Sequence, residues 1–220
     1  MQPEPAPVVR PSPITWLGLF VSLFGLLIVR QAVTYFSPTL TFAAAVWKES
    51  LIWGLAIGLL IIIRRGERLP LTSVGLGHTP WWKSILWGLA LAVVCALIGG
   101  ALVALTGYGH DPGAAIFGKL PLWLITLIVF RAGVVEEFFY RGYAIERLQA
   151  LGLGRFSAGA IPLIIFSVAH WTGGWANIVI ALALGSILAA SYVWRRDLAA
   201  NMIGHFLVDF VGNILPRLFS

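Results

Sequence analysis

Seven long apolar runs dominate the pattern of hydrophobic and polar positions along this chain of 220 residues. Polar, charged or Gly-rich segments separate the runs. A helix needs about 20 residues to cross the hydrocarbon layer of a membrane, and most of the runs approach that length, so we expect membrane-spanning helices. The expected bounds are Ile14–Val29, Phe42–Ile63, Ser84–Leu105, Leu120–Tyr140, Phe156–Trp171, Ala176–Trp194 and Leu198–Leu215.

The composition agrees with a membrane protein. Hydrophobic residues make up 59% of the chain and charged residues 11%, against about 45–50% and about 25% in soluble domains. A soluble globular fold and a disordered chain are therefore excluded, and so is a disulfide scaffold, because Cys95 is the one cysteine. We predict an all-α, polytopic transmembrane bundle of about seven to eight helices with an intramembrane polar cavity.

The segments between the runs suggest three parts. Residues 1–13 are Pro-rich and predict a flexible N-terminal tail. Residues 14–119 hold the N-terminal transmembrane helices, and residues 120–220 hold the helices that carry the charged motifs discussed below. Within the last part, Gly142–Arg155 predicts a short amphipathic piece after the fourth span.

The basic residues predict an orientation with the N-terminus inside. With no disulfide and no signal peptide in the sequence, we expect the cytoplasmic membrane. With that orientation, nine Lys and Arg residues fall in inner loops and four fall outside, as the positive-inside rule requires. Arg30 and Lys48 are among the four, and Lys48 with Glu49 predicts an interfacial pair. No Lys/Arg cluster is interleaved with aromatic residues, so the net charge of +6 does not indicate a nucleic-acid partner. Most tryptophans lie near the ends of runs, where an interfacial belt is expected.

Several ionisable residues lie inside apolar runs, where each costs at least about 2.5–3.5 kcal/mol to insert. The fourth run contains Glu136-Glu137-Phe138-Phe139-Tyr140-Arg141, and the fifth contains Phe166-Ser167-Val168-Ala169-His170. The last run contains Asn201 and the segment His205-Phe206-Leu207-Val208-Asp209. Such residues persist where they face the interior of the bundle and have partners.

Helical spacing separates the two glutamates. Glu137 and Arg141 are four residues apart, in the favourable order for an ion pair on one helix face. Glu136 points about 100° away around the helix and cannot share that pair equally, so it becomes the candidate general base. Arg131 is five residues before Glu136, a spacing that predicts poor pairing along the helix; snorkelling and pairing across helices remain open for it.

The other two motifs also place polar groups on single faces. Asn201, His205 and Asp209 follow one another at four-residue intervals, so they lie on one helix stripe. Phe166 precedes His170 by four residues and can pack beneath its imidazole. Each motif alone favours a structural role. Together they are too costly to bury without a use, so we predict one shared functional site.

These residues resemble a known family. EEFFYR at Glu136–Arg141 matches the motif EExxxR, FSVAH at Phe166–His170 matches FxxxH, and HFLVD at His205–Asp209 matches HxxxN/D. Their order and membrane setting are similar to the CPBP family of intramembrane proteases, also called the Abi or type II CAAX prenyl endopeptidase family, which includes Rce1-like proteins. The motifs cover about the last third of the chain.

The resemblance implies a helical bundle and a glutamate-dependent peptidase. By this resemblance, Glu136 would activate the hydrolytic water and His170 would help to hold it, while Glu137 and Arg141 would orient Glu136. His205 and Asp209 would stabilise the oxyanion. Asp209 stands where Asn is common, and an ionised Asp cannot donate to an oxyanion, so Asp209 would instead orient His205 and keep it able to donate. Phe166 and Asn201 are candidate substrate-binding residues.

Other functions remain open at this point. The resemblance implies a peptide or protein substrate, with or without a prenyl group, beside the lipid bilayer as a partner. No metal is expected, because the HExxH signature of zinc proteases is missing, although two His and several carboxylates would suit Zn²⁺. A non-catalytic membrane scaffold or bacteriocin-immunity protein is one alternative. A proton-coupled transporter is another, but the chain shows no internal repeat.

Overall fold

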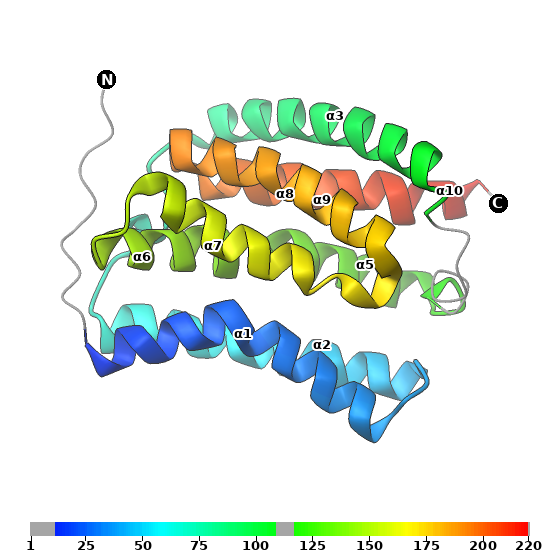
Figure 1. The fold of residues 1–220 in the computed structure, drawn as a ribbon, viewed down its shortest axis with the longest axis horizontal. Coiled ribbons are helices and arrows are strands. Elements are labelled where there is room, and N and C mark those ends of the chain that lie inside the picture. Colours follow the sequence, from blue (N-terminus) through cyan, green and yellow to red (C-terminus); the bar gives the residue numbers. More distant parts are fainter. Residues whose placement is uncertain (1–11, 109–116, 220) are drawn as a thin grey trace.

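The computed structural model describes residues 12–108 and 117–219. Every regular element in these two stretches is helical, and the long helices run side by side along one axis (Figure 1). Among the described residues, four helices are long and apolar enough to cross a membrane, namely Pro13–Phe36, Phe42–Gly66, Trp81–Thr106 and Trp171–Arg195. The predicted all-α transmembrane bundle is therefore confirmed. Most of the expected N-terminal tail, residues 1–11, lies outside the described residues.

The helices follow the apolar runs closely. Leu71–Val74 (η2) and Trp171–Gly173 (η4) are single 3₁₀ turns, and Ile62–Gly66 (η1) and Ala132–Ile145 (η3) are π-helical. The α-helices are Pro13–Phe36 (α1), Phe42–Ile61 (α2), Trp81–Thr106 (α3), Leu122–Arg131 (α5), Glu146–Ala150 (α6), Arg155–Val168 (α7), Gly174–Arg195 (α8), Leu198–Asn213 (α9) and Leu215–Leu218 (α10).

Two expected boundaries are wrong. The first span does not end at Val29, because α1 continues past Arg30 to Phe36. The predicted amphipathic piece Gly142–Arg155 is not a separate element, since residues 142–145 are buried and continue η3, which runs on into α6. The expected end of the first span is wrong because Arg30 is a charged residue within the helix and does not end it.

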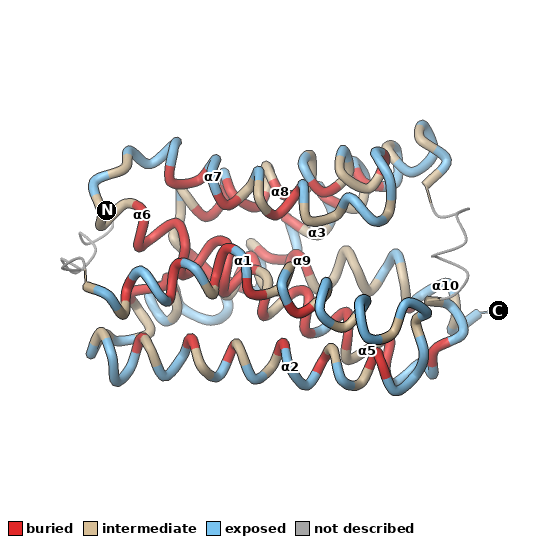
Figure 2. Tube along the Cα trace, turned by 60° about the horizontal axis from the view of Figure 1, so that its bottom comes forward, coloured by how far each residue is buried: buried red, intermediate tan, exposed pale blue. Residues whose placement is uncertain are grey.

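One continuous helix, made of α5, η3 and α6, occupies the centre of the bundle. It packs against α9, α7 and α1, and α3 covers the outer side of α9. Figure 2 shows buried residues concentrated along this helix and on the sides of its neighbours that face it. The approach of α9 is close at Gly133, where a Cβ atom would lie 2.7 Å from Cβ of Phe206. Small residues permit such close packing of membrane helices.

The exterior of the bundle has the character of a lipid-facing surface. Large apolar side chains are exposed along most of the long helices. Exposed tryptophans occur near the starts and ends of these helices, as in an interfacial belt. Trp53 is an exception, because it is only partly exposed and stacks on Phe130 with ring centroids 6.2 Å apart. The exposed tryptophans are Trp16, Trp47, Trp81, Trp82, Trp123, Trp171, Trp175 and Trp194.

Candidate active site

The central helix carries both neighbouring glutamates, and each of them faces a different part of the bundle. Every residue of η3 is buried except Val134 and Glu136. Glu137 is 0% exposed and contacts α9. Glu136 contributes to the wall of a cavity that α1, α2 and α7 also line, and its side chain is 14% exposed. The two carboxylates therefore have different surroundings although they are adjacent in sequence.

Glu137 is the centre of a buried hydrogen-bonded cluster. Its Oε1 accepts from Nη1 of Arg141 at 2.9 Å and from Nδ1 of His205 at 2.8 Å. Its Oε2 accepts from Nδ2 of Asn201 at 3.2 Å. Arg141 also donates to the carbonyl of Gly185 at 3.2 Å. The pair that the spacing of Glu137 and Arg141 predicts is thus present, and the cluster joins the central helix to α8 and α9.

The polar stripe of α9 approaches this cluster from one side. Asn201 is fully buried, and its Nδ2 also donates to the carbonyl of Leu188 at 2.8 Å. Nε2 of His205 lies 3.6 Å from Oδ2 of Asp209, whose side chain is 33% exposed. Asn201 and His205 therefore bind Glu137 directly, whereas the carboxylate of Asp209 lies beside His205. Their roles in binding or catalysis stay predictions.

Glu136 has a partner that the sequence reasoning judged poor. Its Oε1 is hydrogen-bonded to Nη1 of Arg131, and Nε of Arg131 donates to Oε2 of Glu49 on α2 at 3.0 Å. The expectation of poor pairing between Arg131 and Glu136 is therefore wrong. In a π-helix, hydrogen bonds join residues five apart, so the winding that begins at Ala132 brings residues 131 and 136 to the same face.

The same contacts correct a second expectation. Glu49 is 2% exposed and bonds to Arg131, so it does not form an interfacial pair with Lys48. Pairing across helices, which was left open for Arg131, does occur. One arginine thereby binds two carboxylates, one from α2 and one from its own helix.

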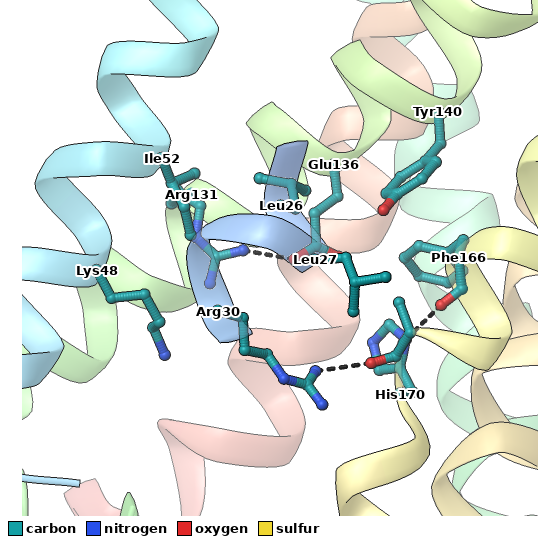
Figure 3. A pocket seen from close by; sticks show the side chains of 11 residues that line it. Leu26, Leu27, Arg30, Lys48, Ile52, Arg131, Glu136, Tyr140, Phe166 and His170 are labelled. Carbon is teal, nitrogen blue, oxygen red and sulfur yellow. Dashed lines mark hydrogen bonds and ion pairs between the residues drawn. The ribbon is translucent and has the colours of Figure 1, made fainter. Parts of the chain in front are cut away.

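His170 faces Glu136 across the cavity. It lies at the end of α7, where its Nδ1 is 2.7 Å from the carbonyl of Phe166 (Figure 3). Because a carbonyl only accepts, Nδ1 carries the proton and Nε2 of the neutral ring is left as an acceptor. This geometry suits a group that holds a water molecule by accepting one of its hydrogens.

Phe166 lies between the cavity and the Glu137 cluster. It is 5% exposed, and its ring centroid is 4.6 Å from that of His170 and 5.3 Å from that of Tyr140. The guanidinium carbon of Arg141 lies 4.5 Å from the same ring centroid. Phe166 therefore packs beneath His170, as its spacing predicts, and its ring also contacts the guanidinium group of Arg141.

The cavity has a volume of about 210 Å³. Apolar residues form part of its wall, and cationic, acidic and aromatic polar residues form the rest (Figure 3). Of the predicted site residues, it brings together Glu136, Phe166 and His170, whereas the Glu137 cluster lies behind this wall. Its lining consists of Leu26, Leu27, Arg30, Lys48, Ile52, Arg131, Glu136, Tyr140, Phe166, Ala169 and His170.

Three polar residues of this lining were missed in the sequence reasoning. Arg30 and Lys48 were expected on the outer side of the membrane, Arg30 at the end of the first span and Lys48 near the outer end of the second, but both line the cavity. No Pro or Gly follows Arg30 before Phe36, and four of these six residues are apolar or aromatic, which was a signal that the helix runs on. Tyr140 is part of the EExxxR motif, but one sequence gives no reason to select the variable positions of a motif.

Metal binding finds no support in the arrangement of side chains. Within residues 12–108 and 117–219, no group of three or more His, Cys, Asp and Glu side chains is placed to hold a metal ion. His170 and His205 belong to separate hydrogen-bonded groups, one at the cavity and the other at Glu137.

Comparison with known families agrees with the geometry. The family model described as type II CAAX prenyl endopeptidase Rce1-like matches residues 118–211. Over this segment, the chain is similar to the Rce1-like family. No curated protein and no solved structure gives a significant match.

The Rce1-like segment contains every residue of the three motifs. Both carboxylates of the central helix, His170 and the polar stripe of α9 fall within residues 118–211. The first three helices lie outside the segment, although α1 and α2 supply one wall of the cavity. The family and the four apolar spans together make the chain an integral membrane protein.

Proposed function

We propose that this protein is an intramembrane endopeptidase that hydrolyses a peptide bond with a water molecule activated by Glu136. The observation that carries the proposal is the placement of Glu136 and His170 on two walls of one cavity. Both present hydrogen-bond acceptors, a carboxylate oxygen and a neutral imidazole nitrogen. A water molecule between two acceptors donates one hydrogen to each and directs a lone pair away from them.

In this mechanism Glu136 acts as the general base. Its Oε1 is held by Arg131, which fixes the carboxylate and leaves Oε2 to take a proton from the water. The water oxygen forms a bond to the carbonyl carbon of the substrate, and the carbonyl oxygen becomes an oxyanion. Glu136 then returns the proton to the leaving nitrogen as the carbon–nitrogen bond breaks. General acid–base catalysis of this kind contributes about 10²–10⁴-fold in rate.

Two donors are available for the oxyanion. His205 does not line the cavity, its Nδ1 binds Glu137 and its Nε2 lies 3.6 Å from Oδ2 of Asp209, so it would have to turn from Asp209 in order to donate through Nε2 to an oxyanion. The hydroxyl of Tyr140 is a second donor, because this residue lines the cavity and its hydroxyl points into it (Figure 3). Donors that are already in place when negative charge develops give the largest electrostatic gain.

The Glu137 cluster has a positioning role in this proposal. Arg141, His205 and Asn201 hold Glu137, and Glu137 is adjacent in the backbone to Glu136. A helix held at this residue cannot rotate freely, so the neighbouring carboxylate stays directed into the cavity. Phe166 extends this support to His170 through ring contact.

The test is cleavage of fluorogenic peptides, prenylated and unprenylated, by the purified full chain in detergent. The wild type is compared with Glu136→Gln and His170→Ala, each with and without a strong chelator. We expect cleavage by the wild type with and without the chelator, a loss of about 10²–10⁴-fold in Glu136→Gln, and a smaller loss in His170→Ala. The peptides that are cleaved define the substrate class.

A matched control is Glu67→Gln. Glu67 is another buried carboxylate paired with an arginine, Arg147, but it does not line the cavity. This variant is expected to lose stability while its folded fraction keeps the turnover number of the wild type. Equal turnover by Glu136→Gln and the wild type would overturn the proposed base. Activity lost to the chelator and restored by zinc would replace the mechanism with a metal-dependent one.

A further inference from the structure

The cavity wall has more positive than negative side chains. Arg30, Lys48 and Arg131 line the cavity, and the carboxylates near them are Glu136 and Glu49. Arg131 binds both of these carboxylates. The two remaining cations therefore have no carboxylate partner among residues 12–108 and 117–219.

Arg30 is held in place by neutral groups. Its Nη1 donates to the carbonyl of Ala169 at 2.7 Å, and its Nη2 donates to Oγ1 of Thr172. These bonds orient the guanidinium beside His170, which follows Ala169 in the chain, but they do not neutralise its charge. The Arg30 side chain is therefore positioned next to the proposed water site without an ion-pair partner among the described residues.

Lys48 supplies the second charge from α2. Its ammonium group makes no hydrogen bond and no ion pair within the described part of the chain, although it lines the cavity. Figure 3 shows Lys48 and Arg30 extending to the same side of the cavity, from α2 and α1. Within membrane-spanning helices, cations without an ion-pair partner are costly, and an anion bound near both of them would remove part of that cost.

We propose that Arg30 and Lys48 form a subsite that binds a carboxylate of the substrate next to the bond that is cleaved. The inference rests on the proposed peptidase function. A substrate group is favoured as the anion because the cations share a cavity of about 210 Å³ with Glu136 and His170. A cavity of this size holds only a short stretch of peptide around the reacting bond.

The carboxylate has two sources in a peptide, its free C-terminus and an acidic side chain. Leu26, Leu27 and Ile52 form the apolar part of the same wall, so the remainder of the bound stretch is expected to be apolar. Both cations lie outside residues 118–211, so the subsite is a feature of the N-terminal helices of this chain. It would determine specificity, while the Rce1-like segment supplies the chemistry.

The experiment compares matched peptides with the full chain in a zwitterionic detergent. One pair differs only in a C-terminal carboxylate or amide a few residues after the cleaved bond. A second pair differs only in Glu or Gln at the first residue after that bond. The ratio of kcat/KM within each pair is measured for the wild type, Arg30→Gln, Lys48→Gln and the double variant, with thermal unfolding to verify folding.

We expect the wild type to prefer the carboxylate member of one pair by about 10- to 100-fold, the range for hydrogen bonds to charged groups. Each single variant should reduce this ratio, and the double variant should bring it close to one. Arg30→Lys should retain part of the preference, because it keeps the charge. The control is Lys83→Gln, an exposed lysine of α3 outside the cavity, which should keep the wild-type ratio.

The outcomes separate the subsite from the peptidase function. Cleavage of all four peptides with equal kcat/KM overturns the subsite and leaves the peptidase standing. A preference that survives in the double variant also overturns it. Cleavage of none of these peptides or of the fluorogenic panel overturns the peptidase function and the substrate subsite with it. If added anionic lipid inhibits the wild type but peptide charge has no effect, the cations bind a lipid headgroup and the proposal fails.

Discussion

Replacing each of the two adjacent glutamates with glutamine should separate stability from catalysis. Glu137 is buried and binds three side chains, Arg141, His205 and Asn201. In Glu137→Gln, Arg141 loses its carboxylate and keeps the carbonyl of Gly185 as its acceptor. Breaking a buried ion pair by removing one partner costs about 3–5 kcal/mol.

Glu136→Gln should be much less damaging to the fold. Its partner Arg131 keeps a second carboxylate, Glu49, and a glutamine oxygen still accepts from the guanidinium. The cost is that of weakening one charged hydrogen bond, about 1–2 kcal/mol. The same change removes the proposed base, so the rate should fall by about 10²–10⁴-fold.

The assay is thermal unfolding in detergent, followed by the fluorescence of the 10 tryptophans. A loss of 1 kcal/mol lowers Tm by about 2–4 °C in proteins of this size. We therefore expect Tm to fall by about 6–20 °C in Glu137→Gln and by only a few degrees in Glu136→Gln. Activity is measured well below both Tm values, so that unfolding does not reduce the rate.

The reverse pattern would refute the reasoning. If Glu137→Gln unfolds at the wild-type temperature, the buried cluster does not stabilise the bundle as its hydrogen bonds indicate. If Glu136→Gln is the less stable variant and keeps its turnover in the folded fraction, the two carboxylates have the opposite roles.

Three further substitutions test other parts of the structure. Gly133→Ala places a methyl group 2.7 Å from Cβ of Phe206 and should lower the free energy of unfolding by about 1–3 kcal/mol or more. Gly100→Ala is the control, because a Cβ atom there would meet no neighbouring group within 4 Å. Its Tm should stay unchanged or rise slightly. Tyr140→Phe should lower kcat by about 10²-fold with little change in KM, and an unchanged kcat would remove its hydroxyl as an oxyanion donor. Arg147→Leu leaves buried Glu67 without its ion pair and should cost about 3–5 kcal/mol, measured by Tm, with kcat of the folded fraction unchanged.

Much of the fold could be predicted, because an apolar run of about 20 residues has few alternatives to a membrane-spanning helix. The second, third and sixth runs match α2, α3 and α8 to within a few residues at each end. The errors came at charged residues. Arg30 was taken as the end of a span, although a buried or cavity-facing arginine does not interrupt helical hydrogen bonding. The pattern of apolar residues therefore predicts where the helices lie, but a single charged residue does not predict where a helix ends.

The site was predictable where residues on one helix face act together. Glu137 with Arg141, and His205 with Asp209, needed only the four-residue spacing of an α-helix. The contacts between helices were not predictable in this way. Nothing in the sequence placed Lys48 of α2 beside Arg30 of α1, or Glu49 beside Arg131, because these approaches depend on how the helices pack.

The π-helical winding of the central helix explains why the pairing of Arg131 with Glu136 was not expected, and this pairing affects the charge of the cavity wall. In an α-helix, residues 131 and 136 would point about 140° apart, and Arg131 could then serve Glu49 or Glu136, but not both. Because η3 begins at Ala132, Arg131 reaches both carboxylates. Both of these carboxylates are thereby bound to Arg131, and neither forms an ion pair with Arg30 or Lys48. The preference for an anionic group that we propose therefore follows from the local winding of the backbone as much as from the choice of side chains.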